Sequence, residues 1–231
     1  MARLTPTSPR PARARAVVRR LREVYPDAGT SLDYRNGWEL LVAVILSAQC
    51  TDARVNEVTP GLFRRWPGPG DLLAATTEEL EEAIRPTGFF RNKTRSLRGA
   101  AAYLLEHHDG EIPRSTAELV KVPGAGRKTA AVVLGEAYGI AEGIAVDTHA
   151  GRISRRLGLV ESEDAIRAER ELMEVVPRRS WIEWTHLLIH HGRAVCTSRA
   201  PRCAACVLLD ICPEGQERRR ESRNVPARRR A

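Results

Sequence analysis

Several residue types and patterns are scarce in this chain of 231 residues. Lysine occurs only at positions 93, 121 and 128, so nearly all of the 37 basic residues are arginine. Cysteine occurs five times, and aromatic residues make up 5% of the sequence. No stretch approaches the roughly 20 consecutive apolar residues of a membrane-spanning helix, and no apolar signal segment follows the first arginines. We therefore expect a cytoplasmic protein with no membrane partner, in which each lysine needs an explanation.

The composition indicates a folded protein with a basic surface. Hydrophobic residues make up 42% of the sequence, and 29 acidic residues remain beside a net charge of +8. A basic surface favours a polyanionic partner, most often nucleic acid. An arginine-rich proteome would also raise the pI, so composition alone leaves both explanations open.

Apolar residues recur at helical spacing through most of the chain, as in Leu41, Val42, Ile45 and Leu46. Clusters of Gly and Pro separate these segments, and no stretch alternates as a β-strand does. The pattern predicts an all-α protein of about ten short helices. Residues 1–14 and 214–231 are rich in arginine and lack apolar periodicity, and we expect both to be disordered basic tails.

The segment over residues 119–134, LVKVPGAGRKTAAVVL, predicts two apolar helices joined by a Pro-Gly-x-Gly turn. Gly124 and Gly126 allow a close approach to the backbone, so that N–H groups at the start of the second helix can face a phosphate. Arg127 and Lys128 follow and add positive charge where these donors point. An ordinary turn between two helices is the alternative, which a lone Gly-x-Gly does not exclude.

Four of the five cysteines are crowded near the C-terminal end, with the spacing C-x6-C-x2-C-x5-C. Four thiolates so close in sequence can bind one metal centre, either zinc or an iron–sulfur cluster. Zinc ribbons generally use two C-x2-C pairs, and only one is present. The spacing also differs from that of ferredoxins. The candidate ligands are Cys196, Cys203, Cys206 and Cys212, and Arg199 and Arg202 lie between the first two on a loop suited to phosphate contact.

Taken together, these motifs resemble the helix-hairpin-helix DNA glycosylases of the endonuclease III family. VPGAGRKTA is followed by Asp147 in VDTH, and ILSAQCTD (45–52), TGFFRNK (87–93) and HGRAVC (191–196) are similar to the family's other landmarks. The resemblance covers about residues 15 to 213. It implies two helical domains flanking a DNA-binding cleft: a barrel over 30–141 that ends in the hairpin, and a cluster domain formed by 15–29 and 142–213.

The resemblance also implies an activity and assigns residues to it. The family consists of glycosylases and abasic-site lyases of base excision repair, which act as monomers on double-stranded DNA with damaged bases, here oxidised pyrimidines, or abasic sites. It implies that Lys128 is the nucleophile on C1′ of the deoxyribose and Asp147 the carboxylate beside it. The cysteine spacing matches the family's [4Fe–4S] cluster pattern. Gln49 would enter the hole left by the flipped base, with Phe89 as an apolar wedge.

The residue types suit this chemistry without the family. Breaking a glycosidic bond builds positive charge on the sugar, which a carboxylate stabilises, and a neutral amine can capture C1′. Arginine cannot replace the lysine, because its guanidinium stays protonated. Lys128 beside Arg127 therefore indicates a need for an amine, whereas phosphate contact is the simpler alternative for it. Asp147 can also be a helix N-cap, and Phe89 a core residue.

Two other functions are weighed against this interpretation. The related adenine glycosylases that act on mismatches usually lack a lysine in the hairpin and carry a further C-terminal domain, whereas this chain has Lys128 and a short tail. A non-catalytic DNA-binding or redox-sensing module is the rival of another class. The combination of Lys128 and Asp147 argues against it, because such a module needs neither an amine nor a carboxylate at the hairpin.

Overall fold

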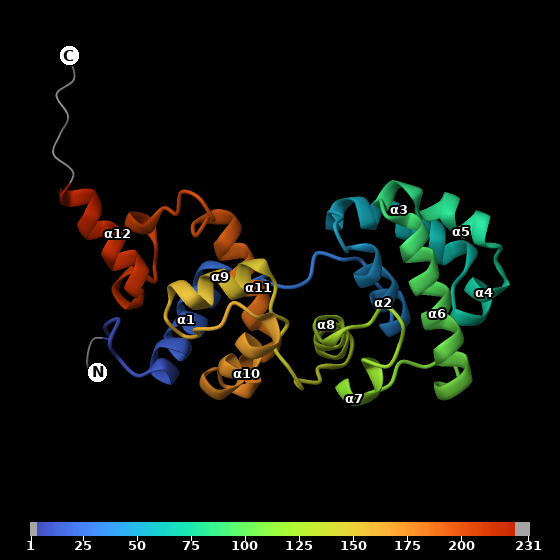
Figure 1. Cartoon of the computed structure of the whole chain (residues 1–231), viewed down its shortest axis with the longest axis horizontal. Coiled ribbons are helices and arrows are strands. Elements are labelled where there is room, and N and C mark those ends of the chain that lie inside the picture. Colours follow the sequence, from blue (N-terminus) through green and yellow to red (C-terminus); the bar gives the residue numbers. More distant parts are fainter. Residues whose placement is uncertain (1–3, 225–231) are drawn as a thin grey trace, which may run out of the picture. The chain divides into compact units, whose positions relative to one another are not determined.

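The computed structural model describes residues 4–224, and within them it is helical with no β-strand. The all-α prediction is therefore confirmed (Figure 1). In chain order the α-helices are α1 (Arg10–Val24), α2 (Gly37–Leu46), α3 (Asp52–Arg65), α4 (Pro69–Ala74), α5 (Thr77–Ile84), α6 (Phe90–His108), α7 (Thr116–Leu119), α8 (Arg127–Tyr138), α9 (Thr148–Arg156), α10 (Ala165–Val175), α11 (Trp181–Ala194) and α12 (Pro213–Asn224). Short 3₁₀ helices lie at η1 (Arg85–Thr87), η2 (Arg178–Ser180), η3 (Cys203–Ala205) and η4 (Leu209–Ile211).

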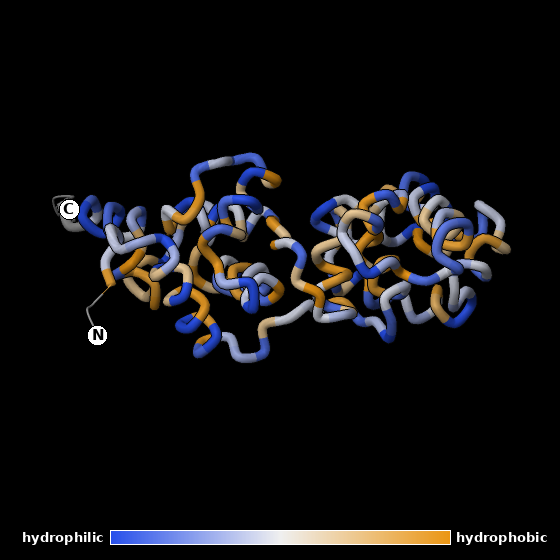
Figure 2. The backbone as a smooth tube through the Cα atoms, turned by 90° about the horizontal axis from the view of Figure 1, so that it is seen from below, coloured by the Kyte–Doolittle hydropathy of each residue, from blue (hydrophilic) through white to orange (hydrophobic). Residues whose placement is uncertain are grey.

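The chain divides into two compact units. The hairpin unit is Thr30–Gly143 and contains α2 to α8; the cysteine unit is Met1–Gly29 with Ile144–Ala231 and contains α1 and α9 to α12. Each unit has its own hydrophobic core, visible in Figure 2 as apolar stretches inside each group of helices. The divisions between the two units fall after Gly29 and after Gly143.

The hairpin unit is built around α2, in which every residue except Val44 is buried. A helix that is apolar on all sides must be surrounded by other elements, and α3, α6 and α8 pack against it. A Cβ at Gly37, the first residue of α2, would overlap the hydroxyl of Tyr138 at the end of α8. At the other end of α2, Ile45 lies against Gly124 just before α8 begins. The two helices therefore run antiparallel in close contact.

The cysteine unit begins with a helix where an irregular tail was expected. The prediction of a disordered tail over residues 1–14 is wrong for 10–14, because α1 starts at Arg10 and packs against α10 and α11. Ala14 is fully buried, and Arg13 is only 6% exposed. The Arg13 guanidinium donates to the carbonyl oxygens of Ser8, Leu157 and Gly158. No local sequence pattern distinguishes a buried arginine that donates to main-chain carbonyls from an arginine on the surface. Arg13 was therefore predicted to lie in the tail.

The expected C-terminal tail over 214–231 is also partly helical, since α12 covers residues 213–224. Glu214, at the start of α12, forms ion pairs with Arg156 and Arg218, and Gly215 is buried against Cys212 and Leu209. Residues 4–9 of the first expected tail contain a turn, in which the N–H of Ser8 donates to the carbonyl oxygen of Thr5 at 3.1 Å. Residues 1–3 and 225–231 of the two expected tails lie outside the described residues. No helix within residues 4–224 is long and apolar enough to cross a membrane.

Candidate active site

The predicted hairpin is formed by α7, a tight turn and α8. Ser115 caps α7 by accepting a hydrogen bond from the N–H of Glu118 at 3.3 Å. Gly124 has φ +84°, and a Cβ there would lie 3.0 Å from Ser96 Cβ and 3.2 Å from Ile45 Cδ1. Gly126 is the N-cap of α8 with φ −79°, and no atom lies within 4 Å of the place where its Cβ would be. Gly124 is thus required by the fold itself, whereas the space beside Gly126 is open to a ligand.

The three lysines have different surroundings. Lys93 is only 4% exposed, and its ammonium donates to the carbonyl oxygens of Leu46 and Thr87, both at 2.8 Å. Lys121 forms an ion pair with Glu118 at 2.8 Å, and the hydrogen bond to that carboxylate raises the pKa of Lys121. Lys128 is exposed on the first turn of α8, beside Arg127. Lys128 is therefore the lysine that combines exposure with a place at the open hairpin turn.

The structure brings three of the sequence landmarks together in one groove of the hairpin unit. Gln49, Phe89, Gly124 and Thr129 line this groove, which has a water-accessible volume of about 290 Å³. Thr129 directly follows Lys128. The groove therefore joins the turn after α2, the turn before α6 and the start of α8.

Gln49 and Phe89 share an unusual backbone conformation. Their φ angles are +52° and +47°, in the left-handed region that residues other than glycine rarely occupy. Both side chains are exposed, Phe89 to 61%. The neighbouring Phe90 packs against the core instead, so the alternative of Phe89 as a core residue does not hold. Cys50 follows Gln49 in the turn after α2, and it packs partly against the core.

Asp147 is half-buried in the cysteine unit, at the N-terminus of α9. Its Oδ1 accepts a hydrogen bond from the N–H of Ala150 at 2.7 Å, so Asp147 is the helix N-cap that the sequence allowed. A carboxylate is favoured there by the partial positive charge of the helix terminus. His149 follows in the first turn of α9, and burial lowers its pKa. A Cβ at Gly192 of the HGRAVC motif would overlap the His149 ring, which explains why α11 has glycine there.

Four cysteines line one small, mainly apolar cavity of the cysteine unit: Cys196, Cys203, Cys206 and Cys212. The N–H of Leu208 donates to Cys206 Sγ at 3.4 Å, and the N–H of Gly215 donates to Cys212 Sγ at 3.3 Å. Burial raises the pKa of Cys206 to about 11 and that of Cys212 to about 12. Within residues 4–224, no three His, Cys, Asp or Glu side chains are grouped closely enough to hold a single metal ion. The donor set of four thiols with N–H groups directed at sulfur nevertheless suits a thiolate-ligated centre.

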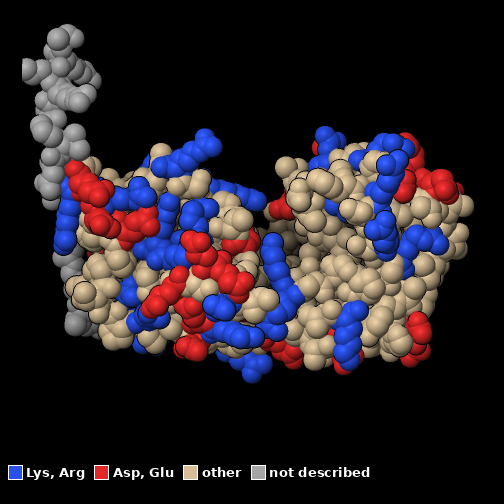
Figure 3. Space-filling model, in the orientation of Figure 1, with Lys and Arg blue, Asp and Glu red and all other residues tan. Residues whose placement is uncertain are grey.

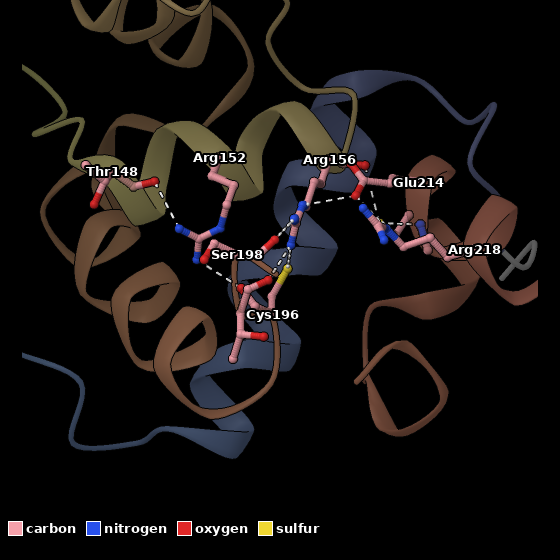
Figure 4. Close-up of polar contacts among 10 residues, drawn as sticks. Thr148, Arg152, Arg156, Cys196, Ser198, Glu214 and Arg218 are labelled. Atoms are coloured by element: carbon pink, nitrogen blue, oxygen red, sulfur yellow. Dashed lines mark hydrogen bonds and ion pairs between the residues drawn. The ribbon is translucent and has the colours of Figure 1, made fainter. Parts of the chain in front are cut away.

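Residues 196–202 form a loop, called the cysteine loop below, that is held by Arg152 and Arg156 of α9. Neither arginine was predicted from the sequence to have a function. Arg156 donates to the carbonyl oxygens of Thr197 and Ser198, both at 2.8 Å, and to Cys196 Sγ at 3.4 Å. Arg152 donates to the carbonyl oxygen of Cys196 at 2.9 Å. Figure 4 shows both side chains pointing from α9 toward this loop. The only sequence hint was their spacing of about one helical turn from each other, which surface arginines also show.

The two loop arginines predicted to contact phosphate have different environments. Arg199 is exposed. Arg202 is also exposed, but its guanidinium donates to the carbonyl oxygen of Ala194 and its own N–H donates to that of Val195. Arg202 therefore closes the loop onto the end of α11 while keeping part of its surface accessible. On the face drawn in Figure 3, basic and acidic side chains are interspersed over the cysteine unit.

The chain is similar to a known class of proteins. Residues 42–178 match the family described as HhH-GPD superfamily base excision DNA repair protein. The chain is 49% identical to Endonuclease III of Synechocystis over 204 residues, which is 88% of this chain and 93% of the relative. It is 46% identical to Endonuclease III of Bacillus subtilis over 197 residues, which is 85% of this chain and 90% of that relative.

A solved structure of a trapped Endonuclease III–DNA covalent intermediate superposes with a TM-score of 0.84 at 43% identity, covering 90% of this chain and 98% of the other. The chain belongs to the endonuclease III family of the HhH-GPD superfamily. It is accordingly a DNA glycosylase and abasic-site lyase of base excision repair.

The two hairpin glycines should respond differently to alanine. Gly124→Ala should lower the free energy of unfolding by about 1–3 kcal/mol, because it combines a positive φ with a Cβ pressed against Ser96 and Ile45. Gly126→Ala is the matched control and should cost less than about 1 kcal/mol, the preference of an N-cap for glycine over alanine, because its φ is negative and its Cβ position is open. Urea unfolding monitored by circular dichroism measures both; equal losses would contradict this distinction.

Proposed function

We propose that this enzyme removes damaged bases, oxidised pyrimidines in particular, from duplex DNA through a covalent intermediate on Lys128. The observation that carries the proposal is the state of the three lysines: Lys93 is buried against two carbonyls, Lys121 is paired with Glu118, and Lys128 is exposed beside the groove. The similar Endonuclease III that was trapped as a covalent intermediate with DNA supports a covalent route.

DNA binding would begin at the hairpin. The N-terminus of α8 presents backbone N–H groups and partial positive charge, which suit a phosphate. The open space beside Gly126 allows a phosphate to approach this terminus closely. Arg127 beside it, and Arg199 and Arg202 on the cysteine loop, would add contacts to the phosphate backbone. Such contacts fix the position of the protein without reading the base sequence.

Base flipping would use the two exposed turns of the groove. Extruding a base costs stacking and pairing energy and leaves a hole in the duplex. Gln49 is exposed and can hydrogen-bond to the base left without a partner, while the exposed ring of Phe89 can stack where the flipped base was. Their left-handed backbones support this proposal, because residues in such sparsely populated conformations cluster at active sites and ligand-binding sites.

The chemistry would proceed in two stages at the sugar. The lone pair of the neutral Lys128 amine forms a bond to C1′ as the glycosidic bond breaks, and the base leaves with that bond's electrons and takes up a proton. The nitrogen loses a proton, and the lone pair so regained opens the C1′–O4′ bond, whose oxygen takes up a proton, to give an iminium ion. Loss of a C2′ proton expels the 3′ phosphate and cleaves the strand, and water releases the lysine. Asp147 would stabilise the positive charge that develops on the sugar.

We propose that the four cysteines hold a [4Fe–4S] cluster. Their burial around one apolar cavity and the N–H groups directed at Cys206 and Cys212 fit a thiolate-bound centre. When bound, the cluster supplies four iron–thiolate bonds that fix the shape of the loop. Arg152 and Arg156 hold the main chain of that loop from α9, so that Arg199 and Arg202 are presented on a rigid support.

We further propose that the enzyme acts as a monomer in the bacterial cytosol, with double-stranded DNA as its partner. The curated relatives are bacterial proteins named Endonuclease III. The proposed groove, hairpin and cysteine loop all come from one chain, so no second copy is needed to complete them.

Lys128→Arg should abolish the covalent intermediate while preserving most DNA affinity. The guanidinium keeps the positive charge for phosphate but has no usable nucleophile. Borohydride added during the reaction should trap a protein–DNA adduct with the parent and none with the variant, and strand cleavage should disappear with it. Lys121→Arg is the matched control and should behave like the parent. An adduct formed by Lys128→Arg at the parent rate would mean that another amine is the nucleophile.

Asp147→Asn should lower the base-excision rate while keeping the fold. Asparagine caps a helix as well as aspartate does, so the change removes charge from the sugar cation without removing the cap of α9. We expect a loss on the order of a hundredfold in single-turnover rate, typical of removing one electrostatic group. Asp164→Asn is the control, because Asp164 caps α10 in the same way: its carboxylate accepts a hydrogen bond from the main-chain N–H of Arg167 at 2.9 Å. A parent-like rate for Asp147→Asn would remove the carboxylate from the mechanism.

Protein purified without oxygen should contain iron and show the visible sulfur-to-iron absorption that zinc cannot give. Cys203→Ala should lower both the iron content and the stability, because one ligand of the cluster is lost. Cys50→Ala removes the one cysteine in the hairpin unit and should leave the iron content unchanged. Metal analysis that found one zinc and no iron would show the cluster assignment to be wrong.

A further inference from the structure

We propose that Lys93 is a positioning residue for base flipping: its buried ammonium ties together the two turns that carry Gln49 and Phe89. This inference rests on the roles proposed above for Gln49 and Phe89. Each lysine of this arginine-rich chain needs an explanation, and Lys93 is one that the catalytic mechanism does not use.

The hydrogen bonds of Lys93 reach the segments just before both residues. Its Nζ donates to the carbonyl oxygen of Leu46, the last residue of α2, and to that of Thr87, the last residue of η1, both at 2.8 Å. The turn to Gln49 follows Leu46, and Gly88 and Phe89 follow Thr87. The main-chain N–H of Lys93 also donates to the carbonyl oxygen of Phe89 at 3.1 Å. One residue thus fixes where both turns begin.

These two carbonyls are suitable partners for a cation. Carbonyl groups in the last turn of a helix lack partners within that helix, and the partial negative charge of the terminus favours a positive group. Leu46 ends α2 and Thr87 ends η1, so the Lys93 ammonium closes two helix ends at once. Lysine suits the task better than arginine, because a compact ammonium can donate in several directions within a small buried space.

The turns need such an anchor because of their backbone conformations. Gln49 and Phe89 have positive φ angles, and so does Gly88 at +70°. Non-glycine residues keep this conformation only where the surrounding structure holds it. Lys93 also lines the groove between the two turns, together with Gln49 and Phe89 themselves. The separation of the two side chains across the groove therefore depends on one buried amine.

Burial lowers the pKa of Lys93, because an ammonium is poorly solvated there. A neutral amine still has two N–H donors, enough for both carbonyls. The link between the turns is therefore expected to persist in either protonation state, and its function is geometric rather than a response to pH.

A double-mutant cycle between Lys93 and Gln49 tests the inference. The substrates are a duplex with one oxidised pyrimidine opposite adenine and the same duplex with an abasic site. Lys93→Met keeps the length of the side chain but has no donor, and it should slow base excision about tenfold because two buried carbonyls lose their partner. Cleavage at the abasic site, where no base must be extruded, should fall less than about threefold.

The coupling between the two positions distinguishes positioning from a general loss. If Lys93 acts through Gln49, Lys93→Met should slow base excision only about twofold in a Gln49→Ala background, because the group that it positions is already absent. Lys121→Met removes a lysine outside the groove and should leave both rates unchanged. Fully additive effects of Lys93→Met and Gln49→Ala, or equal losses on the two substrates, would overturn the proposal.

Hydrogen exchange separates a local effect from a loss of stability. In Lys93→Met, the main-chain amides of residues 47–50 and 87–92 should exchange faster, while those of α3 and α8 should keep the parent rates. Uniformly faster exchange throughout the hairpin unit would show Lys93 to be merely structural. If Lys93→Met does not fold, Lys93→Gln provides the same comparison, since it keeps one amide donor on a shorter side chain. Because exchange is measured without DNA, it tests the anchor even if the parent enzyme fails to excise the base.

Discussion

The close packing of α2 against α8 is the constraint on which the functional surface of the hairpin unit depends. Two contacts define it: Gly37 against Tyr138 at one end, and Ile45 against Gly124 at the other. Both rely on the absence of a side chain, so the distance between the helix axes has little room to vary. Because Gln49 follows α2 and Lys128 starts α8, the spacing of these residues is inherited from the core rather than set by the loops.

Most of the fold could be predicted from local patterns. Apolar spacing and clusters of Gly and Pro are enough to predict an all-α protein, as the structure confirms. The two predicted tails were wrong in the parts that form α1 and α12, because these helices are rich in arginine. In α1, Arg13 is bonded to carbonyls of a turn that follows α9, and in α12 Glu214 pairs with Arg156. These contacts join residues far apart in sequence, and a local pattern of charge cannot reveal them.

The residues of the candidate site were likewise predicted only in part. Gln49, Phe89 and Gly124 were found from motifs, and the structure brings them into one groove. Lys93, Arg152 and Arg156 were not assigned, although all three hold main-chain carbonyls beside that groove or the cysteine loop. Arg152 and Arg156 have the same residue type as the arginines proposed to contact phosphate, and Lys93 has the same residue type as Lys128. Only the burial of the side chain and the direction in which it points distinguish the cations that hold carbonyls from the others. Both are properties of the folded chain. The catalytic roles of Lys128 and Asp147 stay predictions until they are measured.

The way in which Arg152 and Arg156 hold the cysteine loop has a consequence for its evolution. Their guanidinium groups bind the carbonyl oxygens of Cys196, Thr197 and Ser198, atoms that every amino acid possesses. The anchoring therefore does not depend on the identity of Thr197 or Ser198. Mutation can change the outward chemistry of this loop without loosening the attachment that keeps it in place.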